Sequence, residues 1–286
     1  MEKTLTKKTI TAHTLVKNEA RYVWFAVMSV IQHVDQVLLW DTGSTDETLE
    51  IINEIRKSPE GKKVCIKKVK EVTAETFPQV RQCMLDETKT DWILMVDGDE
   101  VWWEDSVLKV VDLINSKGSS IESIVVPTVN LVGDIYHYQD NTSGMYELAG
   151  RKGHLNLRGV NRKIPGLHSS GVHGQWGWAD GDNKMIQNRN PQRIVYTEAP
   201  YLHATNVPRA GSFEKEADVP KRSLKKKYEL GNEFPLDYYY PEVFFRPKPE
   251  IVPTPWVTVG SKFKFMATIQ TPLRRIKRKF VKKVGY

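Results

Sequence analysis

Residues 91–100 read Asp-Trp-Ile-Leu-Met-Val-Asp-Gly-Asp-Glu, an apolar run that ends in a cluster of acids. Such a run is typical of a short strand buried on both faces of a sheet. Asp97 and Asp99 follow this predicted strand, with Gly98 between them to allow a tight turn. Ligands of open α/β sheets bind outside the carboxyl ends of the strands, so both carboxylates are expected there. Carboxylate oxygens suit Mg²⁺ or Mn²⁺, and such an ion would in turn hold a phosphate; the alternative is an acidic, solvated turn.

Length and composition allow one large α/β domain, with or without an appendage. The chain has 286 residues, of which 40% are hydrophobic, enough for a substantial core. Its two cysteines are too few for a disulfide framework or a metal cluster, which favours a reducing compartment. Residues 1–11 are polar and carry no secretory signal, and the longest apolar run, residues 22–31, is too short to cross a bilayer. We therefore expect a cytoplasmic protein without transmembrane helices.

The formal net charge of +7 is concentrated at the C-terminus. Nine of the 42 Lys and Arg lie in residues 260–286, which hold no Asp or Glu, so the rest carries 33 basic and 35 acidic side chains. Pro272 is acceptable at the first position of a helix. From there, apolar residues recur at helical spacing: Leu273, Ile276, Phe280 and Val284.

A basic amphipathic helix of this kind suits an anionic membrane surface. We therefore expect residues 262–286 to hold the protein, as a peripheral protein, at the inner face of the cell membrane. A disordered basic tail or a nucleic-acid arm is the alternative. Nucleic acid is the less favoured partner because nothing before this tail resembles a nucleic-acid-binding motif.

Strand and helix signals alternate over the first 130 residues, which is typical of an α/β sheet protein. The predicted strands are residues 10–16, 34–40, 64–69, the run after Asp91, and 121–130. The predicted helices are residues 20–33, 47–57, 79–87 and 105–115. Residues 133–190 are rich in Gly, His, Trp and Asn with poor periodicity, and predict loops or a small sheet that shapes a pocket.

Three short segments follow predicted strands in order: residues 16–19 (Val-Lys-Asn-Glu), 41–46 (Asp-Thr-Gly-Ser-Thr-Asp) and 97–100 (Asp-Gly-Asp-Glu). In this order and spacing they resemble the successive motifs of family 2 glycosyltransferases, over roughly residues 9–130. The resemblance implies the GT-A fold, a Rossmann-like, mostly parallel central sheet flanked by helices. It also implies a nucleotide-sugar donor, a divalent metal and inversion at the anomeric carbon.

The expected domain organisation follows from this resemblance. Residues 1–210 form the glycosyltransferase domain, with a nucleotide-binding half at about 9–130 and an acceptor-side half at about 131–210. Residues 211–286 are a Pro- and aromatic-rich extension that ends in the basic helix.

The resemblance also assigns residues to the donor site. Val16 and Glu19 match the segment near the nucleoside, and Asp41 matches the position that contacts the base. A carboxylate at a strand end can accept the imide N–H of uracil, so a UDP-sugar is favoured; the alternative for Asp41 is a simple cap or Asx turn. Arg81 matches an arginine that neutralises the donor, and the guanidinium suits bidentate phosphate contacts.

Asp97, Gly98 and Asp99 match the metal and ribose-diphosphate motif of the family. A metal there would bridge the two phosphates and stabilise the leaving nucleoside diphosphate. His203 follows a short apolar stretch, at a place where similar enzymes carry a third metal ligand. The resemblance therefore implies a metal site formed by Asp97, Asp99 and His203, for Mn²⁺ or Mg²⁺.

An inverting transfer needs one base opposite the leaving group. Asp180 is the predicted base, because its distance to the next predicted strand resembles that of a Gly-Glu-Asp segment in many relatives. Asp182 and Glu147 are the alternatives. A second group of relatives carries its acid in a Val-His-Glu segment, where this chain has Val172-His173-Gly174.

The sequence thus predicts an inverting, metal-dependent glycosyltransferase. It would move a sugar to a hydroxyl of a glycan or lipid-linked acceptor in cell-surface polysaccharide or glycolipid synthesis. A sugar nucleotidyltransferase, the first alternative, would carry a Gly-rich phosphate loop where residues 17–20 read Lys-Asn-Glu-Ala. The second is a degenerate protein that binds sugar nucleotides or nucleic acid without catalysis, which the missing acid after His173 keeps open.

Overall fold

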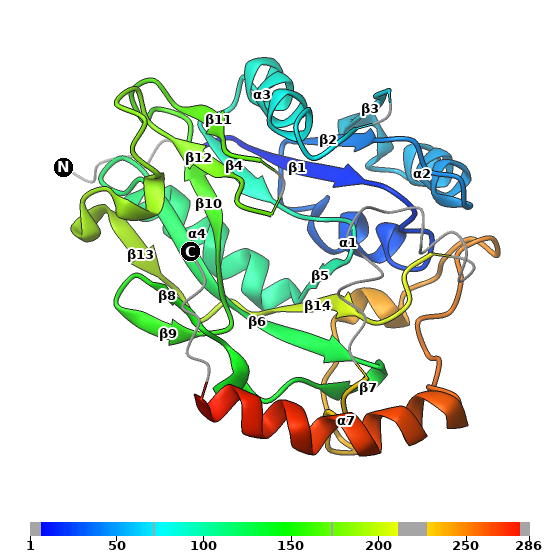
Figure 1. Cartoon of the computed structure of the whole chain (residues 1–286). Coiled ribbons are helices and arrows are strands. Elements are labelled where there is room, and N and C mark those ends of the chain that lie inside the picture. Colours follow the sequence, from blue (N-terminus) through cyan, green and yellow to red (C-terminus); the bar gives the residue numbers. More distant parts are fainter. Residues whose placement is uncertain (1–6, 71, 173, 211–227, 281–286) are drawn as a thin grey trace.

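The chain forms a mixed α/β structure around one large sheet (Figure 1). The computed structural model describes residues 7–70, 72–172, 174–210 and 228–280. His173, residues 211–227 of the predicted extension, and residues 281–286 of the predicted basic helix lie outside the described residues.

Four parallel strands make up one half of the sheet, in the order β3-β2-β1-β4. They are β1 (Ile10–Val16), β2 (Gln36–Asp41), β3 (Val64–Lys68) and β4 (Trp92–Met95). The accompanying helices are α1 (Val23–Val30), α2 (Thr48–Lys57), the short η1 (Gly61–Lys63), α3 (Phe77–Glu87) and α4 (Glu104–Lys117). The sequence-based strands and helices of this region are confirmed. The expected α/β class, with a central sheet flanked by helices, is likewise confirmed.

Alternating side chains of β2 show why helices cover both faces of the sheet. Val37 and Leu39 belong to the main core together with residues of α1 and α2. Leu38 and Trp40 point to the opposite face, where they pack with Met84 of α3. A strand with apolar residues on both faces must be covered on both, because successive side chains point to opposite sides.

The other half of the sheet is mixed and centres on the long strand β6 (Ser123–Val132). Antiparallel β10 (Leu155–Asn161) lies between β6 and β4 and so joins the two halves. The remaining strands of the sheet are β5 (Glu100–Trp102), β7 (Asp134–Tyr138), β13 (Ile194–Tyr196), β14 (Tyr201–Asn206) and β15 (Asn232–Glu233). β14 runs parallel to β6 and antiparallel to β5, which brings the end of β14 next to the acids that follow β4.

Residues 133–190 contain both loops and small sheets, together with β10, which the poor periodicity did not reveal. Two hairpins extend from the main sheet: β8 (Tyr146–Leu148) with β9 (Arg151–Gly153), and β11 (His168–Ser170) with β12 (Gly177–Ala179). Single turns of 3-10 helix complete the connections: η2 (Asn141–Ser143), η3 (Ile186–Asn188), η4 (Pro191–Arg193) and η5 (Glu242–Phe245).

The last described element is the helix α7 (Ser261–Phe280), which lies along one border of the molecule beside β7 (Figure 1). The sequence predicted a helix beginning at Pro272, but α7 begins at Ser261 and Pro272 lies inside it. This expectation was wrong because proline, although best tolerated in the first turn of a helix, can also lie further inside one. Among the described helices none is both long and apolar enough to cross a membrane.

Candidate active site

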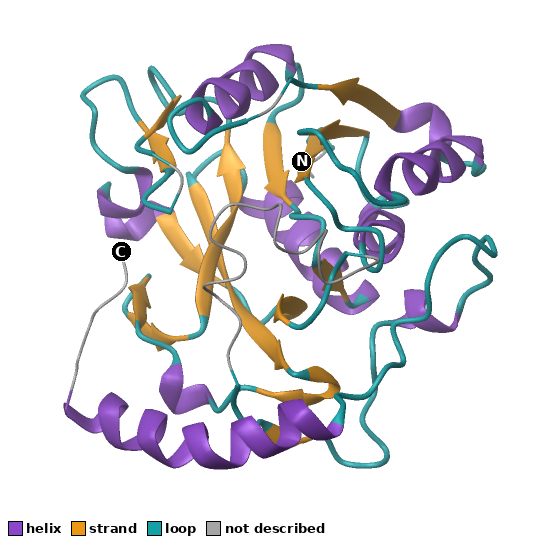
Figure 2. Cartoon of the chain, turned by 45° about the vertical axis from the view of Figure 1, so that its right-hand side comes forward, coloured by secondary structure: helices purple, strands orange, loops and turns teal. Residues whose placement is uncertain are grey.

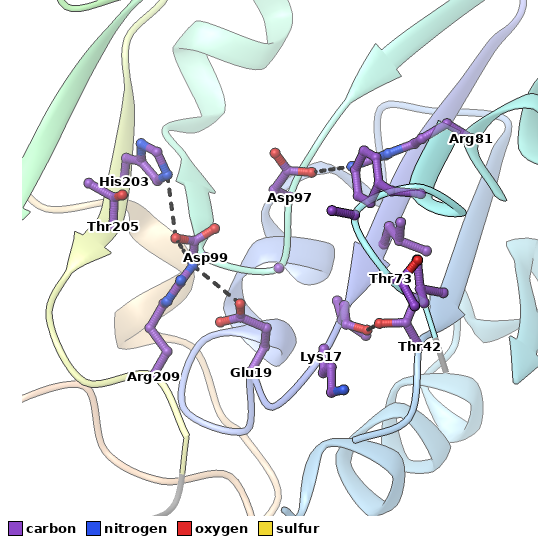
Figure 3. Close-up of a pocket in the computed structure, with 16 residues that line it drawn as sticks. Lys17, Glu19, Thr42, Thr73, Arg81, Asp97, Asp99, His203, Thr205 and Arg209 are labelled. Atoms are coloured by element: carbon purple, nitrogen blue, oxygen red, sulfur yellow. Dashed lines mark hydrogen bonds and ion pairs between the residues drawn. The ribbon is translucent and has the colours of Figure 1, made fainter. Parts of the chain in front are cut away.

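A pocket of about 260 Å³ opens at the carboxyl ends of β1 and β4, where the three sequence motifs meet (Figure 3). Residues of the first motif and its strand, the loop before α3, the acids after β4, and the end of β14 all contribute to its wall. The predicted site residues that line it are Val16, Glu19, Arg81, Asp97, Gly98, Asp99 and His203. The fold therefore brings together seven residues that the sequence assigned to donor and metal binding.

Hydrogen bonds join the first motif to the second. The amide of Asn18 donates to Ser44 Oγ at 2.8 Å, and Asn18 Oδ1 accepts from the amide of Thr45 at 2.7 Å. Asn18 adopts a left-handed backbone with φ of 51°, a conformation that asparagine tolerates better than most residues. The amide of Glu19 donates to Thr48 Oγ1 at 2.8 Å, which ties the loop to the first turn of α2. These contacts fix the direction in which Glu19 enters the pocket.

Asp41 is buried and forms the Asx turn that the sequence offered as its alternative role. Its Oδ1 accepts from the amides of Gly43 and Ser44, each at 3.0 Å. Its Oδ2 is also buried and has no hydrogen-bond partner among the described residues. Asp41 does not belong to the wall of the pocket, although the next residue, Thr42, does. Its contact with a nucleotide base stays a prediction, for which Oδ2 is the available acceptor.

Gly98 is required because two motifs approach each other closely at this point. A Cβ at Gly98 would lie 2.6 Å from Cγ1 of Val16 and 3.0 Å from Cγ of Glu19. Any side chain would push the first motif away from the acids after β4. The glycine therefore serves close packing of the two motifs, within the tight turn expected from the sequence, which the amide of Glu100 closes by donating to the carbonyl of Asp97 at 3.0 Å.

Asp97 and Asp99 point in different directions (Figure 3). Asp97 accepts a 2.7 Å hydrogen bond from Nη2 of Arg81, and Nη2 of Arg158 lies 3.6 Å from its other oxygen. Burial alone would raise the pKa of the Asp97 carboxyl, but Arg81 and Arg158 outweigh this effect and lower it. Asp97 is therefore ionised and orients the two guanidinium groups.

Asp99 is buried and faces the end of β14. It forms an ion pair with Nη1 of Arg209, and the same nitrogen lies 3.2 Å from Oε1 of Glu19. Nε2 of His203 lies 3.4 Å from Oδ2 of Asp99, and Nδ1 of His203 contacts Asn130 at 3.1 Å. All three carboxylates in the pocket wall, those of Glu19, Asp97 and Asp99, thus have an arginine partner.

A second buried acid lies directly behind the pocket. Glu100, the first residue of β5, forms an ion pair with Arg158, which also donates to the hydroxyl of Tyr201 at 3.1 Å. Burial raises the pKa of Glu100 to about 7, while the nearby Arg158 acts in the opposite direction. Arg158 therefore lies close to both Glu100 and Asp97. In this way Arg158, a residue of β10, links the second half of the chain to the acidic motif.

Arg81 is placed to meet an anion. It is 3% exposed, and its Nε and Nη1 have no hydrogen-bond partner among the described residues. Its guanidinium carbon lies 5.3 Å from the ring of Phe77 and 5.0 Å from that of Trp176. Aromatic faces attract the guanidinium without occupying its N–H donors, so donors remain for a phosphate.

The donor set fits a divalent cation only in part. Among the described residues no group of three His, Cys, Asp or Glu side chains is arranged to hold a metal ion. Asp99 and His203 are close enough to share one, and Mg²⁺ is commonly held by one or two carboxylates with substrate phosphates and water. These two residues fit a metal that arrives with a diphosphate, provided that Arg209 leaves Asp99. Asp97, the third predicted ligand, faces arginines instead.

Asp180, the predicted base, is not brought to the pocket. It follows β12, where Oδ1 accepts from the amides of Asp182 and Lys184 and Oδ2 pairs with Arg189. Two backbone donors and an arginine account for both carboxylate oxygens, which gives this residue a loop-stabilising role. The prediction that Asp180 acts as the base is not supported by this placement. The alternatives Asp182 and Glu147 do not line the pocket either.

Sequence reasoning missed Arg158 and Arg209. Each is a single charged residue outside the motifs, and each meets its acid across a long stretch of chain, 58 positions to Glu100 and 110 to Asp99. The available signal was electrostatic. Three acids at the end of β4 (Asp97, Asp99 and Glu100) require positive partners, and only the fold shows which arginines supply them.

Comparison with known proteins identifies the family. The model of glycosyl transferase family 2 matches residues 11–175, which is more than half of the chain. The chain belongs to glycosyl transferase family 2. This membership confirms the resemblance seen in the three motifs, and the matched glycosyltransferase domain contains all of them.

Individual relatives of this glycosyltransferase domain are distant or partial. An uncharacterized glycosyltransferase of Rickettsia bellii (strain RML369-C) is 37% identical over 102 residues, 35% of this chain and 30% of the relative. S. aureus TarS has a TM-score of 0.48 at 13% identity, covering 69% of this chain and 37% of TarS. Glucosyl-3-phosphoglycerate synthase from Mycobacterium tuberculosis, in complex with Mn²⁺ and UDP, has a TM-score of 0.44 at 16% identity, covering 69% of this chain and 72% of the synthase. The chain thus matches less than a third of the curated relative's length.

Proposed function

We propose that the protein is an inverting glycosyltransferase that takes a nucleotide-sugar, with a UDP-sugar favoured, as its donor. The observation that carries this proposal is the joint placement of Glu19, Asp99, Arg81 and His203 in one pocket at the strand ends. Carboxylates suit the ribose and a cation, whereas a guanidinium with unused donors suits a diphosphate. Family membership supplies the reaction class to which this arrangement belongs.

Divalent metal dependence is part of the proposal. Asp99 and His203 would hold Mn²⁺ or Mg²⁺ with the donor diphosphate, and the ion would stabilise negative charge on the leaving nucleoside diphosphate. Arg81 would bind the same diphosphate from the other side, held in place by Asp97. Asp41 would accept from the base through Oδ2, which is the physical reason to favour uracil.

The acceptor is proposed to be a hydroxyl of a glycan or of a lipid-linked molecule in cell-surface polysaccharide or glycolipid synthesis. The protein would then act at the inner face of the cell membrane, as a peripheral protein. The basic C-terminal segment supports this part of the proposal.

Calorimetric titration with UDP, GDP, CDP and dTDP, each with Mn²⁺ and with EDTA, tests donor binding. We expect one nucleotide, UDP, to bind with Mn²⁺ and to lose most of its affinity in EDTA. If none of the four binds, the donor-site assignment is wrong.

A non-catalytic sugar-nucleotide binder is the second candidate. The observation that favours it is the placement of Asp180 outside the pocket, which leaves the predicted base away from the donor. Hydrolysis of UDP-sugars distinguishes the two. A transferase releases UDP slowly when water replaces the acceptor. A binder with the same affinity releases no UDP from any of the UDP-sugars tested.

A further inference from the structure

The helix α7 presents an apolar stripe to solvent on the side that faces away from the protein body. Four large apolar side chains of α7 are exposed: Phe265 (66% exposed), Ile269 (51%), Leu273 (64%) and Ile276 (55%). At about 100° per residue, these four fall within roughly 80° of the helix circumference. Exposed apolar side chains scattered singly are ordinary, but four in one row along a helix form a surface.

The opposite face of α7 attaches the helix to the body. Ala267 and Thr271 are buried, and Oγ1 of Thr271 accepts from the amide of Leu230 at 2.8 Å. The ring of Phe263 lies over Gly133, where a Cβ would come within 2.9 Å of it. Because this side is packed, α7 cannot turn its apolar stripe inward without losing these contacts. Figures 1 and 2 show α7 at one border of the molecule, with the rest of the protein on one side only.

The charged side chains that α7 itself carries are all basic. Lys262, Lys264 and Arg275 are exposed on α7, and residues 260–286 contain no acid. A stripe with Lys264 and Arg275 along one edge and Lys262 at its start matches a surface that is apolar inside and anionic at its boundary, as a bilayer with acidic lipids is. A second copy of the chain would bring two such basic segments together, and nucleic acid would leave the four apolar side chains in water.

We propose that α7 docks on an anionic lipid bilayer, with Phe265, Ile269, Leu273 and Ile276 inserted at the headgroup boundary and the lysines and arginines on lipid phosphates. The helix would lie in the plane of the membrane, since Phe263, Ala267 and Thr271 hold its first part against the protein body. The docking face thus combines Phe265 and Ile269, ahead of Pro272, with Leu273 and Ile276 of the helix expected from the sequence. The docking requires no donor or acceptor, so it stands or falls separately from glycosyl transfer.

The test is sedimentation of the full chain with vesicles, either of phosphatidylcholine alone or of equal parts phosphatidylcholine and phosphatidylglycerol. We expect binding to the mixed vesicles only, weakened by salt. Leu273→Asn should lower vesicle binding about tenfold or more, because an inserted leucine is lost. Thr268→Asn is the matched control, since Thr268 is exposed on the same helix outside the stripe, and its binding should equal that of the unmodified chain. Arg275→Gln should weaken binding about fivefold.

Four results would overturn the docking proposal. Equal sedimentation of the protein with neutral and with mixed vesicles would exclude a partner recognised by its anionic lipids. No sedimentation with either kind of vesicle would exclude a bilayer as the partner. Binding of Leu273→Asn as tight as that of Thr268→Asn would show that the stripe does not insert. A dimer in lipid-free solution that dissociates in Leu273→Asn would instead assign the stripe to a second copy of the chain.

Discussion

Arg209 and Asp99 form a buried ion pair in the wall of the pocket at the carboxyl ends of β1 and β4, although 110 positions separate them in the sequence. The same guanidinium nitrogen reaches Glu19, so one arginine serves two motifs. A cation held by Asp99 and His203 would need the carboxylate that Arg209 occupies. A divalent ion would therefore compete with Arg209 for Asp99, which has Arg209 as its counter-charge in this structure.

Removing Arg209 should make the pocket a better cation site. In Arg209→Gln we expect the affinity for Mn²⁺ without nucleotide to rise about tenfold, because Asp99 and Glu19 lose a positive neighbour. Electron paramagnetic resonance of free Mn²⁺ during a titration measures this directly. Arg246→Gln is the control, since Arg246 pairs with Glu104 outside the pocket. Unchanged or weaker Mn²⁺ binding in Arg209→Gln would contradict the competition.

The two aspartates of the third motif should differ in their effect on metal dependence. Asp99→Asn should abolish Mn²⁺-dependent binding of UDP, because Asp99 lies beside His203. Asp97→Asn should weaken UDP binding with and without Mn²⁺, since it frees Arg81 from its orienting partner. Calorimetry on both variants, with melting temperatures to confirm folding, checks this. Retained Mn²⁺-dependent UDP affinity in Asp99→Asn would refute the metal assignment.

The loop position of Asp180 predicts a structural effect of its replacement. Asp180→Asn should leave UDP affinity unchanged and lower the melting temperature, because the pair with Arg189 and two amide contacts are weakened. Differential scanning fluorimetry and calorimetry on one preparation measure both quantities. A variant that keeps its melting temperature and UDP affinity but loses sugar transfer would restore Asp180 as the base.

His13 of β1 should make the fold sensitive to acid. It is fully buried beside Thr88, and burial, with a further effect of Arg81, lowers its pKa to about 3. In the unfolded chain His13 has an ordinary pKa near 6.5. Between that pH and about 3, His13 therefore binds a proton in the unfolded chain but not in the folded one. The free energy of unfolding should therefore fall as pH drops from about 6.5 toward 3, by at most about 1.4 kcal/mol per pH unit from this residue.

Urea unfolding at several pH values isolates the contribution of His13. His13→Gln keeps a hydrogen-bonding group near Thr88 but cannot titrate, so its stability should fall less steeply below pH 6.5. The difference in unfolding free energy between the two chains should shrink with acid. Parallel curves would show that His13 is not the titrating group.

Local sequence signals were sufficient for the first half of the fold. The strand before Asp97 is fully buried, and β1 and β2 are buried except for one residue each; all three are short and bounded by polar turns, so burial and periodicity agree. The same runs end at the pocket, which is why their strand ends, together with the family resemblance, located Glu19, Asp97 and Asp99. Element order in a parallel sheet determines which loops meet.

The second half of the site depends on contacts that no local pattern records. β10 reads as a polar segment because Asn156 and Arg158 face Tyr201 and the acids, yet it pairs on both sides within the sheet. Arg209 follows a strand with no motif of its own. Asp180 has the spacing expected of a base, but its neighbours along the chain satisfy its carboxylate locally, which spacing cannot reveal.

The position of β10 also limits how this protein can be divided or recombined. Because β10 inserts between β4 and β6, a fragment that stops near residue 130 would leave two inner strands with open edges and no partner. The two halves of the chain therefore share the middle of one sheet. Replacing everything after residue 130 would require that part of the sheet to be rebuilt. The hairpins β8–β9 and β11–β12 pair only with themselves, so new specificity can be introduced there without dismantling the scaffold.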